Sequence, residues 1–131
     1  MAASKASLEV PYRLEFENRP GYFYIYIKCG RLDLKTTKAI VREGAKELNK
    51  TAYKKVLVEL DVDKRLSTAD IFWLAAGFPD LGLEEYRFAV VDARLEHEAS
   101  NDFADAAARS NEIRRRTFTS IEEAEQWLAL N

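Results

Sequence analysis

The clearest pattern of apolar and polar positions lies in residues 54–79. Apolar residues run from Val56 to Val62 with few interruptions, as in a central strand that is covered on both faces. A short charged loop at 61–66 follows, and Ser67 and Asp70 have the spacing of a helix capping box. Residues 71–78, IFWLAAGF, contain no polar side chain, and Gly77 then ends the helix. Such a helix is expected to be buried on all sides or covered by a partner.

The rest of the chain alternates between strand and helix patterns. Residues 12–17 and 22–29 alternate apolar and polar positions on either side of a turn, which predicts a β-hairpin. Further segments predict strands at 87–91 and 114–118, helices at 36–49 and 101–111, and a last helix that Ser120 caps. The inner sides of these three helices are expected to be Ile40, Val41, Ala45 and Leu48; Phe103, Ala106 and Ala107; and Ile121, Ala124, Trp127 and Leu128. The order β-β-α-β-α-β-α-β-α predicts an α/β fold with a mostly parallel sheet packed by helices.

Length and composition narrow the function classes. A chain of 131 residues is expected to form one domain, here 12–131, after a loose polar leader at 1–11. A net charge of -2 gives no general attraction to nucleic acid, and no apolar run approaches the length of a membrane span. The one cysteine, Cys29, is interpreted as a core residue and suits a cytoplasmic protein without disulfides. With a single histidine, we expect no multi-histidine metal site and no cofactor.

Two stretches resemble a known family. The end of the chain, RRRTFTSIEEAEQWL, resembles the closing strand and helix of small bacterial SpoIIAA-like proteins, with Phe118, Glu123, Ala124, Trp127 and Leu128 at the matching positions. The stretch RFAVVDARLEHEASNDFADAA resembles the strand and helix before it. The resemblance covers about residues 14–130 and implies the SpoIIAA-like fold of STAS domains, which is shared with lipid-carrying CRAL-TRIO domains.

The resemblance also implies a candidate switch. Anti-sigma-factor antagonists of this family carry a phosphorylatable serine in a D-S-S-G stretch at the start of a helix. Here Ser67 and Thr68 match the hydroxyl positions, while Leu66 and Ala69 replace the Asp and the Gly. A phosphate there would meet free helix amides. The alternative is that Ser67 serves only as the helix N-cap.

Three further groups are candidates for a ligand or partner surface. Asp61 and Asp63 lie where a parallel strand ends, a position that favours ligands, although a solvated loop is the simpler interpretation. Tyr24 and Tyr26 share a strand face that forms an interface or lies under a helix. Candidates in the apolar helix are Phe72 and Trp73, which close a pocket for a small lipid-like ligand or form a protein contact such as a homodimer.

Catalytic signals are weak. His97 lies in a polar segment and is interpreted as a surface residue, and no nucleophile elbow or phosphate-binding glycine motif is present. The basic run 114–116 is interpreted as a solvated sheet edge rather than a nucleic-acid site. We therefore expect a non-enzymatic regulatory module that binds a protein partner through residues 61–78, with a carrier of a small apolar ligand as the alternative.

Overall fold

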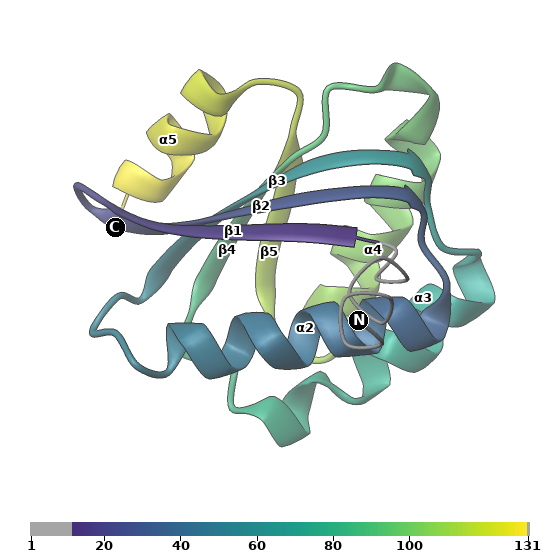
Figure 1. Cartoon of the computed structure of the whole chain (residues 1–131), viewed down its shortest axis with the longest axis horizontal. Coiled ribbons are helices and arrows are strands. Elements are labelled where there is room, and N and C mark those ends of the chain that lie inside the picture. Colours follow the sequence, from purple (N-terminus) through teal and green to yellow (C-terminus); the bar gives the residue numbers. More distant parts are fainter. Residues whose placement is uncertain (1–11, 131) are drawn as a thin grey trace, which may run out of the picture.

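The computed structural model describes residues 12–130, and the expected leader at 1–11 lies outside this range (Figure 1). A five-stranded sheet has the strand order β1-β2-β3-β4-β5. The first two strands form the predicted antiparallel hairpin, and all later neighbours pair in parallel. The strands are β1 (Tyr12–Arg19), β2 (Tyr22–Arg31), β3 (Lys55–Lys64), β4 (Arg87–Val91) and β5 (Arg114–Phe118).

Helices cover both faces of this sheet. In Figure 1, α2 (Leu34–Leu48) and α3 (Thr68–Ala76) lie below the sheet, and α5 (Ile121–Ala129) lies above it. Helix α4 (Glu98–Ser110) belongs to the same layer as α2 and α3, because its inner residues join their hydrophobic cluster. Two short 3-10 helices, η1 (Phe78–Leu81) and η2 (Leu95–His97), precede β4 and α4. The α/β class and the largely parallel sheet are as predicted.

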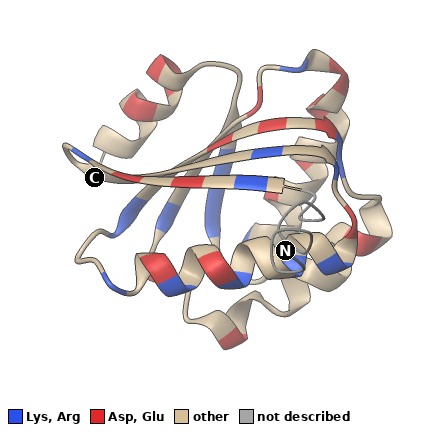
Figure 2. Cartoon of the chain, in the orientation of Figure 1, with Lys and Arg blue, Asp and Glu red and all other residues tan. Residues whose placement is uncertain are grey.

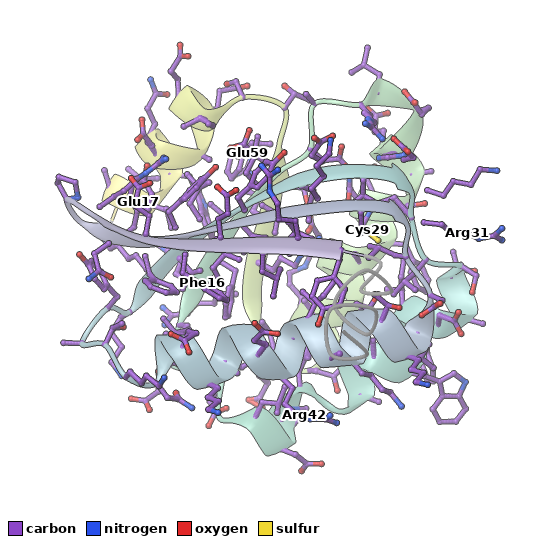
Figure 3. All side chains as sticks on the ribbon, in the orientation of Figure 1. Phe16, Glu17, Cys29, Arg31, Arg42 and Glu59 are labelled. Carbon is purple, nitrogen blue, oxygen red and sulfur yellow. The ribbon has the colours of Figure 1, made fainter. Side chains whose placement is uncertain are left out.

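The alternation of side chains along the strands produces two cores. Phe16 points toward α2, whereas Glu17 and Glu59 point to the α5 side (Figure 3). On β3, Val56 and Leu57 face opposite clusters, and both are 0% exposed. The central strand is therefore covered on both faces, as its continuous apolar run predicts.

Strand β3 is longer than predicted. It continues to Lys64, and its ladder with β2 pairs Lys28 with Asp61 and Arg31 with Lys64. Asp61 and Asp63 are therefore strand residues, and the predicted loop at 61–66 is wrong for most of its length. The charged ends of β2 and β3 pair with each other and extend the sheet beyond its apolar part.

The inner side of α4 also differs from the prediction. Phe103 is exposed, as is Ala106, and the buried residues of the helix are Asn101, Ala104, Asp105 and Ala108. The prediction from apolar residues is wrong here because Asn101 and Asp105 point inward. Both form hydrogen bonds with residues outside α4. The inner sides of α2 and α5 agree much better, with Ile40, Ala45, Leu48, Ala124 and Leu128 buried.

Candidate functional site

Helix α3 begins with the expected cap. The Ser67 hydroxyl accepts a hydrogen bond from the amide of Asp70 at 3.2 Å, and the Ser67 carbonyl accepts one from Ile71 at 3.0 Å. The side chains of Ser67 and Thr68 are exposed, so both hydroxyls are reachable from solvent. The capping function of Ser67 is thus a feature of the structure, and it leaves room for modification.

The outer side of α3 exposes two large aromatic side chains. Phe72 is 57% exposed and Trp73 is 64% exposed, and their rings meet edge to face with centroids 5.7 Å apart. Only Ile71 and Ala75 of this helix are buried. Asp70 is its one charged residue, and the helix is otherwise tan in Figure 2, while acidic and basic segments alternate along α2. The sequence predicted that this helix is either buried on all sides or covered by a partner. Residues 12–130 do not bury it on all sides.

Beneath α3 lies an apolar cavity. It has a volume of about 200 Å³ and is lined by side chains of the sheet and of α2, α3 and α4. Ile71, Leu74 and Ala75 of α3 line it, opposite Ile27 and Val58 of the sheet. Helix α3 therefore lines the cavity with one side and exposes the rings of Phe72 and Trp73 on the other.

Two arginines line this cavity, which is apolar elsewhere except at Thr37. The side chain of Arg65 is 9% exposed, and that of Arg115 is 13% exposed. Arg115 faces Asp105 at 3.1 Å, whereas Arg65 donates to the side-chain oxygen of Asn101 at 2.9 Å. The prediction of a solvated basic edge at 114–116 is wrong for Arg115. Strand alternation turns it to the helix-covered face, where Asp105 compensates its charge.

A buried polar cluster extends from these arginines. The Asp92 carboxylate, directly after β4, faces the His97 Nδ1 at 2.9 Å and accepts from the Asn101 amide at 3.0 Å. The His97 Nε2 lies 3.2 Å from the carbonyl oxygen of Asp63. His97 is only 6% exposed, so its interpretation as a surface residue is wrong. Its partners join the ends of β3 and β4 to α4.

The pKa values in this cluster follow from burial and pairing. Burial opposes ionisation of Asp92, but the hydrogen bonds from Asn101 and His97 outweigh it and lower the pKa of that carboxyl. Burial is the main cause that lowers the pKa of Arg115 to about 10. The negative charge of Asp105 raises this pKa, and the positive charge of Arg65 lowers it further. Both arginines are therefore cations at neutral pH, held in a largely dry environment.

Asp61 and Asp63 form ion pairs at the other face of the sheet. Asp61 accepts from Lys28 at 3.0 Å and from Tyr26 at 2.9 Å, and these two bonds, Lys28 first, lower its pKa. Arg94 spans both carboxylates, at 3.1 Å from Asp61 and 2.8 Å from Asp63. Because side-chain cations already occupy these carboxylates, they are poorly placed to bind Mg²⁺. Residues 12–130 contain no group of three or more metal-ligating side chains.

The tyrosines of β2 lie on the face that α5 covers. Tyr24 is 8% exposed, and its hydroxyl donates to Glu59 at 2.5 Å. The Arg19 guanidinium lies 3.6 Å from the centroid of the Tyr24 ring, and Arg13 lies 5.6 Å from that of Tyr26. The sequence left this strand face as an interface or as a face under a helix. Tyr24 lies under α5, in agreement with the second interpretation, whereas Tyr26 is only half-buried.

Comparisons with known proteins agree with this architecture. No protein-family model and no curated protein matches the sequence. An anti-sigma factor antagonist from Mycobacterium paratuberculosis superimposes with a TM-score of 0.60 at 15% identity, over 92% of this chain and 96% of that chain. A protein from Shewanella loihica described as having a SpoIIAA-like fold gives 0.50 at 18% identity, over 90% and 94%. The chain has the SpoIIAA-like fold. The phosphorylated form of the Bacillus cell fate determinant SpoIIAA gives 0.51 at 11% identity, over 88% and 99%.

The SpoIIAA-like fold confirms the resemblance seen in the sequence at the level of architecture. Within that fold, the structure brings Ser67, Thr68, Phe72 and Trp73 together on one short helix. It separates them from Tyr24 and Tyr26, which lie on the opposite face of the sheet. No helix among residues 12–130 combines the length and apolar character that crossing a membrane requires.

Sequence reasoning missed the buried cluster of Arg65, Asp92, His97, Asn101, Asp105 and Arg115. One signal was present: His97, Asn101 and Asp105 follow one another at intervals of four, which places them on one face of a helix. An aspartate directly after the apolar strand RFAVV was a second signal, because that position adjoins the start of the next helix.

Proposed function

We propose that this protein is a non-enzymatic regulatory module that binds a protein partner through helix α3. The exposed pair Phe72 and Trp73 carries the proposal, because adjacent aromatic rings more than half exposed are typical of interface anchors. A second copy of this chain, as a homodimer, is the first partner to test. The SpoIIAA-like neighbours support this class, since the Mycobacterium paratuberculosis protein and SpoIIAA in its unphosphorylated form are both described as anti-sigma factor antagonists. With Cys29 as a free buried thiol, the module suits the cytoplasm.

Replacing Phe72 and Trp73 together by alanine is expected to weaken self-association or partner binding at least tenfold. Each ring is an exposed anchor whose truncation typically costs 1 kcal/mol or more at an interface. Sedimentation equilibrium measures self-association, and affinity capture with quantified binding measures a different partner. The unfolding midpoint should change little, because both rings lie outside the core.

A matched control replaces Leu95, another large apolar residue, which is 73% exposed but lies away from α3 in η2. Leu95→Ala should leave association unchanged. If the control and the double variant weaken binding equally, or if neither weakens it, α3 is not the docking surface.

We also propose that phosphorylation of Ser67 or Thr68 modulates this docking. Ser67 and Thr68 are exposed and lie one to two helical turns before Phe72 and Trp73. SpoIIAA itself is known in both an unphosphorylated and a phosphorylated form. A dianionic group at the start of α3 would meet its free amides and change the charge beside the aromatic pair.

Two substitutions separate the switch from the cap. Ser67→Asp keeps a good N-cap, so the free energy of unfolding should stay within about 0.5 kcal/mol of the parent, while partner affinity changes several-fold. Ser67→Ala loses the cap bond and should destabilise by about 1 kcal/mol without altering affinity. Urea denaturation and a binding titration on both variants provide the measurements. Equal affinities for the two variants would leave Ser67 as a cap alone.

The cavity under α3 favours a second function, the binding of a small apolar ligand. A volume of about 200 Å³ lined mostly by apolar side chains is large enough for a small organic molecule, and voids larger than a water molecule are few in well-packed proteins. Since α3 roofs this cavity with Ile71 and Leu74, a ligand there would also set the position of the aromatic docking surface. Native mass spectrometry of the protein from its host should then show an added apolar mass.

A further inference from the structure

The cavity under α3 has two chemically different parts. Most of its wall is aliphatic, from β2, β3, β4 and the helices, and would contact a hydrocarbon chain. Arg65, directly after β3, and Arg115 of β5 provide the charged part of the wall, and Thr37 of α2 is the other polar residue that lines the cavity. A purely apolar ligand would contact the first part and make no use of the second.

Both arginines keep donor atoms without hydrogen bonds. The buried Nε of Arg65 and the buried Nη1 of Arg115 have no hydrogen-bond partner within residues 12–130. Arg65 Nε lies 3.9 Å from Asp92, beyond hydrogen-bond distance. Arg115 Nη1 lies 3.1 Å from Asp105, but without the alignment of a hydrogen bond. Buried donors are almost always satisfied, so both arginines have hydrogen-bonding capacity that residues 12–130 do not use.

The charges of the buried cluster favour an acidic acceptor. Asp92 and Asp105 balance the two arginines. The Asp92 carboxylate is shared between His97 and Asn101, and it lies 3.9 Å from Arg65 Nε. A further ionised oxygen acceptor would satisfy the arginines more fully, because guanidinium donors bond most strongly to such groups.

We propose that this cavity binds a short-chain carboxylic acid, with its carboxylate on Arg65 and Arg115 and its hydrocarbon chain under α3. The inference rests on the second of the proposed functions and names its ligand class. Benzene, with six carbons, occupies a cavity of roughly 150 Å³, so a volume near 200 Å³ takes about eight non-hydrogen atoms. Hexanoate has this size, and a planar carboxylate matches guanidinium donors.

The test is a titration of the full chain with hexanoate and with 1-hexanol, followed by methyl NMR shifts of Ile71, Leu74 and Val58. We expect both compounds to shift these methyl signals, and hexanoate to bind about tenfold more tightly, because hydrogen bonds to charged donors are the stronger ones. Arg65→Met should remove the preference for hexanoate while leaving 1-hexanol binding intact.

A cavity-filling variant gives an independent control that leaves the charged cluster unchanged. Gly44 of α2 lines the cavity, and an added Cβ would meet Ile25 at an ordinary contact distance of 3.7 Å. Gly44→Met should keep the fold, checked by its unfolding midpoint, and abolish binding of both compounds.

The outcomes separate two failures. If 1-hexanol and hexanoate bind equally to the parent protein, the carboxylate site is wrong and the apolar-ligand function stands. If neither compound shifts the cavity methyls, or if Gly44→Met binds both as the parent does, the cavity is not a ligand site at all. The docking surface of α3 is tested separately and survives either result.

Discussion

Asp105→Ala is expected to lower the free energy of unfolding by about 3–5 kcal/mol, the range for breaking a buried ion pair from one side. The Asp105 carboxylate accepts from the amide and the hydroxyl of Thr117, at 3.0 and 2.9 Å, and faces Arg115 at 3.1 Å. Its removal leaves a buried guanidinium without compensation and the β5 amide without a partner. Urea denaturation at neutral pH, with a constant m-value, measures the loss.

Asp102 offers the matched control, because it lies one turn earlier on α4 and is exposed. Asp102→Ala should change the free energy of unfolding by no more than about 0.5 kcal/mol. A second variant, Asp105→Ala with Arg115→Met, removes both charges and should recover much of the loss, since an apolar replacement of a buried pair is often neutral. If the double variant is as unstable as the single one, the uncompensated arginine is not the cause.

The parts of the fold that sequence reasoning predicted well depend on local signals. The strand at 87–91, the strand at 114–118 and the cap at Ser67 follow from neighbouring residues alone, and the structure has them at those positions. The IFWLAAGF pattern left two surroundings open, burial on all sides or cover by a partner, and the exposure of Phe72 and Trp73 excludes the first. Such signals act within one or two turns, where the chain needs no distant partner.

The parts that it missed depend on distant pairs. Arg115 is buried because Asp105 and Thr117 meet at the junction of α4 and β5, and a basic run gives no sign of that meeting. His97 is buried because Asp92 and the Asp63 carbonyl supply acceptors from two other segments. The burial of a polar residue can be predicted only if its hydrogen-bonding partners are known. The burial of an apolar residue requires only a core to pack into.

The buried cluster adjoins α3, the helix proposed for docking. Arg65 lies three residues before Thr68, the first residue of α3, and donates to Asn101 of α4, while Ile71 of α3 lines the same cavity. A carboxylate bound by Arg65 would therefore act at the start of the helix that carries Phe72 and Trp73. Ligand binding would change partner affinity only if the ligand binds one position of α3 more tightly than another.

Asp92→Asn is expected to destabilise the protein by about 3 kcal/mol at neutral pH, because its side chain is 1% exposed and its partners require an acceptor. Asn101, His97 and the Arg94 amide all direct N–H groups at this carboxylate, at 3.0, 2.9 and 3.2 Å. The asparagine amide would place further N–H groups against one of these donors and would leave Arg65 without its nearest anion.

The pH dependence of this loss has a definite sign. Because the folded-state pKa of Asp92 lies below the unfolded value of about 3.9, its stabilisation is complete above that value and disappears as pH falls through the folded-state pKa. The difference between parent and Asp92→Asn should therefore be greatest at pH 5–7 and shrink below about pH 4. Urea unfolding at pH 7, 4 and 3 measures it, with Asp102→Asn as the exposed control. A difference that stays constant across this range would show that the ionised carboxylate of Asp92 contributes no stability.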